Sequence, residues 1–400
     1  MKTACNMLLF FISALCYSQT IVNVEIRILE GTQLSFTDTV HITPAAQLIN
    51  DGELLLKGDL INNGIFSYTS TSHGSTVHFT GNLQQVKGDQ TSVFYNVVFN
   101  NTTTILKGAI QVDHNADFTR GIVDNEYGGL FFFNDYSDHI NTSNLSFVHG
   151  TVFKSGNVDF SFPIGKDNHY RPAFIENLTN NNRLSSCYFL QDSNALYPHE
   201  SQEGGIDFID NKEYWELKRE VGTDFTMVTL SRNAATSSPE IMNAASDGLR
   251  IVRWDIDKNY WVDEGGLTMP NSDDIKTITN VTGYGIFALA VARTDAILLG
   301  DVVVYNNLTP NGDGVNDALI IKGIEKFQDN IVRIFNRWGA QISEIHGYDN
   351  QEKVFKGYAN SGAGGQSSEP LPSGTYYFSV ECTLAGERIK KIHYLFINGT

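Results

Sequence analysis

The chain has 400 residues, which is enough for roughly two to four domains with substantial cores. It contains 25 Phe, 17 Tyr and 35 Gly, a composition typical of all-β proteins with many turns. The formal net charge of -17 argues against nucleic-acid and anionic-membrane partners, because no basic stripe is present to neutralise phosphates.

The first 18 residues have the order of charge and apolarity found in a secretory signal peptide. Lys2 supplies the positive start, and residues 7–15 form an apolar segment that is too short to span a bilayer as a stable helix. We therefore expect a signal peptide at residues 1–18. A lipoprotein acylated at Cys16 is the alternative, although Leu15 fits a lipobox poorly. The rest of the sequence predicts no transmembrane segment.

Cleavage would leave two cysteines, Cys187 and Cys382, in different expected domains. The cell envelope permits disulfides, but the separation of these two residues predicts two separate buried thiols. No C-x-x-C pair occurs, so zinc ribbons and thioredoxin-like chemistry are not expected.

Residues 19–150 consist of short apolar segments separated by Gly, Asn and Asp turns. The segment at 54–64 (LLLKGDLINNG) is repeated in outline at 104–112 (TILKGAIQV). Short strands at this spacing predict a sandwich, a barrel or a solenoid. The recurring Leu-Lys-Gly and Asn-Asn turns favour a β-solenoid of roughly five or six turns, in which each turn buries its apolar face against its neighbours. A β-sandwich is the alternative.

Residues 151–293 are expected to form a β-sandwich domain, followed by a linker at residues 293–300. Segments such as 249–254 (LRIVRW) alternate in polarity, as strands with one wet face do. The region contains one polar cluster beside a strand end, formed by Asp167, His169, Tyr170 and Arg171. We interpret this cluster as structural, with a binding site as the alternative.

The densest group of turn residues lies at 308–317 (LTPNGDGVND), near the start of a final domain at residues 300–400. Pro fixes φ, Gly permits positive φ, and Asn and Asp can bond their own backbone. The short oxygen side chains of this turn suit Ca2+; they belong to Asn311, Asp313, Asn316 and Asp317. The spacing is not that of an EF-hand and no bidentate Glu follows. An Asx-turn that precedes a strand is therefore the alternative, and no other cofactor is expected.

Three motifs of this last domain occur in the order found in a known family. The turn at 310–317 (PNGDGVND) is followed by 331–339 (IVRIFNRWG) and by 371–378 (LPSGTYYF). The region resembles the gliding-motility-associated C-terminal domain, which is the type B sorting domain of the type IX secretion system in Bacteroidota. The resemblance implies a C-terminal signal that engages the type IX secretion machinery and takes a folded cargo across the outer membrane.

The sequence departs from the family pattern in two places. Residues 355–357 (FKG) stand where the family usually has Trp-Asp-Gly, and the chain ends in Asn-Gly-Thr rather than on a basic residue. Seven or so strands over about a hundred residues also predict an immunoglobulin-like β-sandwich here. The two preceding regions are similar to parts of large Bacteroidota surface proteins, a likeness that carries no known chemistry.

No common catalytic constellation is present. The H-E-x-x-H, G-x-S-x-G and P-loop motifs are absent, and the many acidic pairs are typical of solvated turns in so acidic a chain. We therefore predict a non-enzymatic protein, secreted or on the outer cell surface, whose passenger is an adhesin or binds glycan or matrix.

Two other functions remain open for the passenger. One is a β-helical polysaccharide lyase or glycosidase on the same export route, which would need two carboxylates held about 5 to 10 Å apart across a cleft. The other is a structural surface component that self-associates through an exposed solenoid edge.

Overall fold

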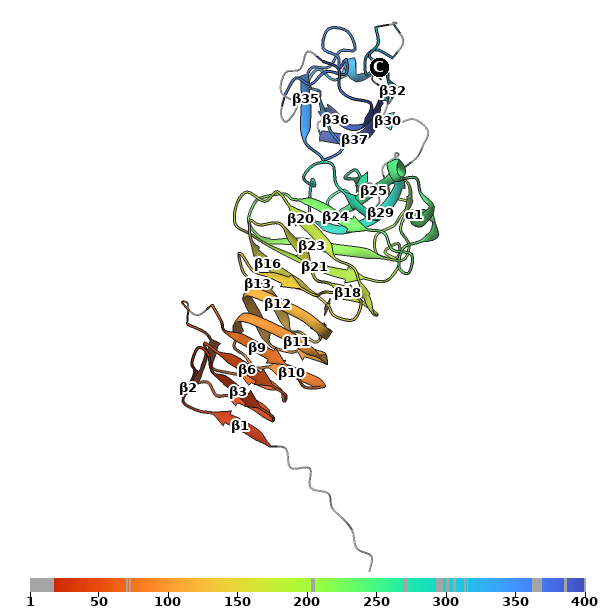
Figure 1. Ribbon diagram of the computed structural model, residues 1–400. Helices are drawn as coiled ribbons and strands as arrows, with labels where there is room; N and C mark the ends of the chain where they lie inside the picture. The colour runs from red at the N-terminus through yellow and green to blue at the C-terminus, as the bar shows by residue number, and fades with distance from the viewer. Residues whose placement is uncertain are drawn as a thin grey trace, which may run out of the picture.

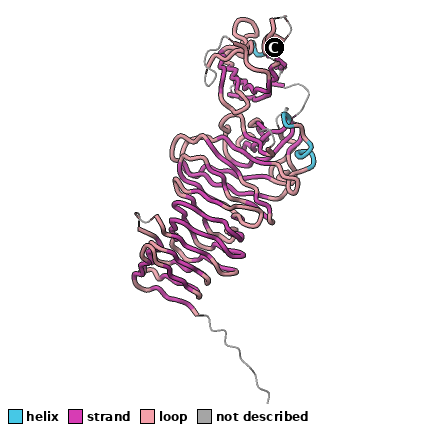
Figure 2. Tube along the Cα trace, viewed as in Figure 1, coloured by secondary structure: helices cyan, strands magenta, loops and turns pink. Residues whose placement is uncertain are grey.

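The computed structural model describes residues 18–400 except 70, 72, 203–205, 269–271, 293–297, 300–301, 305–306, 313, 315, 362–368, 385–386 and 399–400. The expected signal peptide therefore lies outside the described residues, apart from Ser18. The molecule is elongated, with three parts in chain order along its length (Figure 1). Strands dominate every part (Figure 2) and only 3% of the chain is helical, which confirms the all-β fold class.

The N-terminal part is a parallel β-solenoid of about 7 turns. Its strands stack in three columns. The offset in the first column is 20 residues, where Gln19 lies opposite Thr39 and Val40 lies opposite Leu60. The first column begins with β1 (Gln19–Val22), β4 (Thr39–Ile42), β7 (Leu60–Asn62) and β10 (Leu83–Lys87). The second begins with β2 (Glu25–Ile28), β5 (Gln47–Asn50) and β8 (Ile65–Ser67), and the third with β3 (Gln33–Phe36), β6 (Glu53–Leu56) and β9 (Thr76–Phe79).

Two long strands then pass through all three columns. These are β11 (Ser92–Leu106) and β12 (Ala109–Asp124), which pair along most of their length. The last solenoid strands are β13 (Leu130–Phe133), β14 (Asp138–Ile140) and β15 (Val148–His149), one on each column.

Inward side chains of successive turns stack to form the solenoid core. Phe99 packs between Phe79 and Phe118 at ring-centroid distances of 5.6 and 5.4 Å, and all three rings are fully buried. The Asn-Asn-Gly turn has a structural reason as well. A Cβ at Gly64 would lie 2.4 Å from the carbonyl oxygen of Ala46, so only Gly permits the close approach of the two turns.

Strand β16 (Val152–Gly156) belongs to both the solenoid and the central sandwich. It pairs in parallel with β13 and antiparallel with β21 (Asn182–Phe189). The first sandwich sheet continues through β23 (Tyr214–Val221), β29 (Gly285–Ala292), β25 (Leu249–Asp255) and β26 (Tyr260–Asp263), and β22 (Ile206–Ile209) also pairs with β29. A small hairpin, β18 (Gly165–Lys166) and β19 (His169–Tyr170), lies beside this junction.

The second sandwich sheet packs on the first. Its strands, in order, are β17 (Phe160–Phe162), β20 (Ala173–Glu176), β24 (Met227–Ser231), β28 (Asp274–Lys276) and β27 (Leu267–Thr268). The helices α1 (Pro239–Asn243) and η1 (Ser246–Gly248) precede β25. Phe162 and Leu230 of this sheet share one apolar cluster with Trp215 of the first sheet and with Val40 of the solenoid, so the core continues across the junction.

The C-terminal part contains two further sheets. The first has β30 (Leu298–Leu299), β31 (Val302–Val304) and β33 (Ile321–Lys322), and the helix η2 (Ile324–Lys326) follows it. The second has β32 (Asn307–Leu308), β37 (Glu387–Ile397), β36 (Gly374–Leu384), β34 (Ile331–Phe335) and β35 (Gln341–His346). Ile334, Phe378 and Leu395 lie in a separate core of this part.

The outer face of this C-terminal sheet packs on the central sandwich. Phe335, Tyr377 and Ile392 form a buried cluster with Leu267 and Ile278. At the edge of this cluster, Lys390 Nζ donates to Thr279 Oγ1 at 2.7 Å. The two parts therefore share an apolar interface.

The structure also bears on the cysteines and on membrane-spanning helices. Cys187 and Cys382 are both free and buried, which confirms the prediction of two separate thiols. Among the described residues, no helix has both the length and the apolar character needed to span a membrane.

Candidate functional site

A groove of about 670 Å³ opens in the first sheet of the central sandwich, where β29 begins. Strand β29 pairs with β23 only as far as Leu217 opposite Gly285, and with β25 only as far as Arg253 opposite Phe287. Both neighbouring strands continue beyond these pairs. The groove is lined by these continuing ends of β23 and β25 and by residues 282–286, which lead into and begin β29.

One wall of the groove carries a pair of stacked aromatic rings. The rings of Phe225 and Tyr284 lie 5.8 Å apart at an interplanar angle of 14°. The guanidinium of Arg219 lies 4.8 and 5.2 Å from their centroids, within the range of cation–π attraction. Phe225 is 39% exposed, so this wall offers an accessible aromatic face beside a fixed positive charge.

The loop that carries Phe225 is held by hydrogen bonds. Arg219 donates to the carbonyl oxygens of Thr223 and Asp224, both at 2.9 Å, and the Tyr284 hydroxyl donates to the same Asp224 carbonyl at 2.9 Å. Hydrogen bonds from Asn180, and from the backbone of Thr179, hold the pKa of the Asp224 carboxyl well below its usual range. The aromatic wall is therefore pre-organised.

The opposite wall is formed by the end of β25 and by the loop before β22. The ring of Trp254 lies 5.7 Å from that of Tyr197, and Ile256 in the following turn is 68% exposed. Trp254 itself is 6% exposed, so it supports this wall rather than offering its own face.

Charged groups at the base of the groove are paired with one another. Arg253 donates to Glu264 Oε1 at 2.8 Å and to Thr282 Oγ1 at 2.9 Å. A Cβ at Gly283 would lie 2.7 Å from the Arg253 guanidinium carbon, which explains the Gly at this position. Glu216 pairs with Lys218 at 2.7 Å. Paired charges of both signs can donate to and accept from the hydroxyl groups of a ligand.

Of the polar cluster noted in the sequence, only Arg171 is buried in the sandwich core, whereas Asp167 is exposed and His169 and Tyr170 are half-buried. Arg171 forms two hydrogen bonds with Glu213, at 2.9 and 2.8 Å, and both residues are buried. The Tyr188 hydroxyl donates to Glu213 at 2.7 Å, and Trp215 Nε1 donates to the Arg171 carbonyl at 3.0 Å. These contacts support the structural interpretation of Arg171.

A second buried acid, Asp210, lies near Glu213. It accepts hydrogen bonds from the backbone N–H groups of Lys212 and Ser238. Burial, followed by the negative charge of Glu213, raises the pKa of Asp210 to about 7. The folded chain therefore keeps a proton here at pH values where the unfolded chain, with an ordinary pKa of 3.8, has released it.

We expect Asp210→Asn to flatten the pH dependence of stability. The contribution of Asp210 is complete below about pH 4, declines as the pH rises toward about 7, and is absent above that. At pH 8 the Asn variant should therefore melt at a higher temperature than the parent chain, and near pH 4 the two should differ little. Thermal unfolding of both chains at pH 4 and pH 8 measures this. A difference in Tm between the two chains that is the same at both pH values would contradict it.

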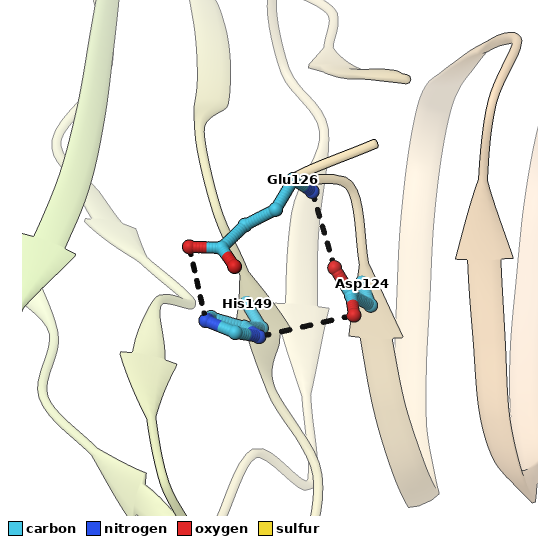
Figure 3. A group of neighbouring side chains, drawn as sticks. All are labelled: Asp124, Glu126 and His149. Carbon is cyan, nitrogen blue, oxygen red and sulfur yellow. Dashed lines mark hydrogen bonds and ion pairs between the residues drawn. The ribbon is translucent and has the colours of Figure 1, made fainter. Parts of the chain in front are cut away.

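A histidine and two carboxylates meet where the last solenoid turns stack (Figure 3). Asp124 of β12 lies opposite His149 of β15. His149 Nε2 lies 3.2 Å from Glu126 Oε1, and Nδ1 lies 3.9 Å from Asp124 Oδ2. A cation bound at Nε2 would have Glu126 as a second ligand, with Asp124 orienting the ring. Lys166 Nζ, 3.3 Å from Glu126, competes with such a cation, so we interpret the group as ion pairs that join neighbouring turns.

The turn predicted to bind Ca2+ lies between β32 and β33, and Asp313 is outside the described residues. Asn311 and Asn316 are exposed. The two carboxylate oxygens of Asp317 accept from the backbone N–H groups of Gly312 and Gly314, both at 2.7 Å. Asp317 thus holds the turn by accepting from residues that precede it, which is not the pattern of an Asx-turn. Ca2+ binding and the Asx-turn both stay predictions.

The other family-like motifs form the strands and turns of the C-terminal sheet. Phe355 is buried in the core of this part, and a Cβ at Gly357, which has φ +81°, would lie 3.0 Å from Pro310 Cγ. The aromatic and Gly of the altered FKG segment thus keep their packing roles. Comparison with protein families then gives one match, in which residues 302–397 fit the CHU_C type IX secretion signal domain.

The chain carries a type IX secretion signal. All three motifs noted in the sequence lie within the matched residues, and the β-solenoid belongs to its passenger. The type IX signal domain indicates export to the cell surface or the extracellular space through the type IX secretion machinery. Neither the curated proteins nor the solved structures contain a match to the chain.

The sequence did not predict the groove of the central sandwich. The sequence predicts only the start of a strand at residues 283–285 (GYG). It likewise predicts only strands at residues 214–217 and 249–254. The groove depends on where three strands stop relative to one another. A clue was available in the two glycines that flank Tyr284, because glycines at a strand end mark close backbone approach.

Proposed function

We propose that the passenger is a non-enzymatic binding module that holds a carbohydrate chain in the groove of the central sandwich. The observation that carries this proposal is the pre-organised aromatic wall of the groove where β29 begins. A sugar ring has an apolar face that packs on an aromatic ring and a rim of hydroxyl groups that needs hydrogen-bond partners. The Phe225–Tyr284 pair offers an aromatic surface for the apolar face of the sugar, and the paired charges at the base offer hydrogen-bond partners for its hydroxyl groups.

Export supports the same proposal. A type IX signal indicates export to the cell surface or the extracellular space, where glycans of other cells and of matrix are the accessible polymers. Two of the carboxylates that line the groove have partners, since Glu216 pairs with Lys218 and Glu220 accepts from the Ser185 hydroxyl at 2.6 Å. This arrangement suits binding. A polysaccharide lyase or glycosidase is the alternative, and the same experiment distinguishes it.

The test is a glycan array probed with residues 19–400, followed by titration of the best-bound glycan. Phe225→Ala and Arg219→Ala should each weaken that binding by about fivefold, because an aromatic or cation–π contact contributes on the order of 1 kcal/mol. Tyr136→Ala, at a solenoid residue that is 80% exposed, is the matched control and should bind as the parent chain does.

The same titrated sample should release no product. New reducing ends or unsaturated sugars would replace the binding proposal with the enzyme alternative. An array without any bound glycan, or a Phe225→Ala variant with unchanged affinity, would overturn the assignment of the groove.

A further inference from the structure

The turn between β34 and β35 presents an exposed tryptophan on the type IX signal domain. Trp338 is 60% exposed, and the Arg337 guanidinium lies over its ring at 4.6 Å. Trp and Arg are the residue types that most often dominate the binding energy of protein interfaces.

The backbone of this turn is held firmly although its side chains are exposed. The Asn336 N–H donates to the Ala340 carbonyl at 3.0 Å, and the Gly339 N–H donates to the Asn336 carbonyl at 3.0 Å. The Asn336 side-chain oxygen also accepts from the N–H groups of Trp338 and Ala340, both at 3.0 Å. Gly339 takes the positive φ of 78° that the turn needs. A partner would therefore meet a pre-ordered Trp with little loss of backbone entropy.

A second motif of the signal domain meets the first at this turn. A pocket of about 130 Å³ is lined by residues 336–338 and by residues 372–376. The second segment is fixed by the Tyr376 hydroxyl, which donates to the Pro372 carbonyl at 3.0 Å. Parts of the IVRIFNRWG and LPSGTYYF motifs, more than thirty residues apart in sequence, thus form one surface. We call this surface, residues 336–338 and 372–376, the tryptophan patch.

The largest apolar side chains of these motifs on the strands are covered, and Arg333, which is half-buried, pairs with Glu344 and Glu381. Ile334 and Phe378 face the core of the domain, and Phe335 and Tyr377 are buried against the passenger. If the secretion machinery receives the passenger and the signal domain as one folded chain, it therefore contacts these two motifs at the tryptophan patch rather than along the strands.

We propose that the tryptophan patch is the surface by which the type IX secretion machinery holds this protein. The complementary site on the machinery offers an apolar or aromatic cavity for the Trp338 indole and a carboxylate for Arg337, since a partly desolvated Arg needs an opposite charge. The pocket beside the indole takes a small side chain of the partner.

The test is secretion of the full chain by a Bacteroidota host with a working type IX system. Trp338→Ala and Arg337→Glu should each lower the amount of protein on the surface and in the medium by about tenfold, with the chain retained in the periplasm. Tyr358→Ala and Phe396→Ala are the matched controls, because these aromatics of the same domain are 40% and 43% exposed. Both controls should be secreted like the parent chain.

Folding is checked on the retained protein. The Trp338→Ala chain should melt at the same temperature as the parent after purification from the periplasm, and Trp338→Phe should restore part of the secretion. Normal secretion of Trp338→Ala, or an equal loss with Tyr358→Ala, would overturn the proposal. These outcomes are independent of glycan binding in the groove.

Discussion

Replacing Glu213 by Gln should lower the free energy of unfolding by about 3–5 kcal/mol, the usual effect of breaking a buried ion pair. Glu213 is fully buried and accepts from Arg171, Tyr188 and Ser237. Gln occupies the same space but leaves the Arg171 guanidinium, which is 2% exposed, without a compensating charge. The buried cation then opposes folding.

Denaturant unfolding of residues 19–400 measures this effect. Glu25→Gln is the control, because Glu25 forms an exposed pair with Arg27 at 4.0 Å and should change stability by less than about 1 kcal/mol. Adding Arg171→Met to Glu213→Gln should recover part of the loss by removing the unpaired charge. A Glu213→Gln chain within about 1 kcal/mol of the parent would show that the pair does not organise the core.

Transfer of the signal domain should be sufficient for type IX export. A reporter placed between residues 1–18 and residues 298–400 is expected to reach the surface or medium of a host with a working type IX system, and to stay in the periplasm without one. The reason is that residues 302–397 contain the whole family match and a separate core. The measurement is the distribution of the reporter between periplasm, surface and medium.

The matched control is the natural chain ended at residue 300, which should remain in the periplasm of both hosts. This truncation uncovers Leu267 and Ile278 of the passenger, so its solubility must be checked separately. Equal export of the truncated chain, or no export of a folded reporter fusion, would contradict the expected role of the signal domain.

The solenoid could be predicted from its turns, but its length could not. The Gly and Asn turns between short strands gave the architecture, and the expectation of five or six turns falls short of the about 7 observed. The difference has a physical origin. Strands β11 and β12 have 15 and 16 residues, and each runs through all three columns. The Gly and Asn loop residues that separate the three short strands of the other solenoid turns are therefore missing there.

The groove and the tryptophan patch were beyond prediction for another reason. Both depend on where separate segments end in space, as Leu217 and Gly285 do in the groove. Strand register follows from long-range pairing rather than from local propensity. The IVRIFNRWG and LPSGTYYF motifs identified the signal domain from sequence, yet only the structure shows that Trp338 and Pro372 line one pocket.

The shared strand β16 has a mechanical consequence. A hinge between two domains needs a segment whose backbone is free to rotate, but β16 is hydrogen-bonded on both sides, to β13 and to β21. The 22-stranded sheet and its core therefore continue from β1 to β29. A force applied at the groove is therefore transmitted to the solenoid without a flexible joint between them. If the passenger rotates about its junction with the signal domain, it rotates as one rigid body, and the first solenoid turn moves furthest.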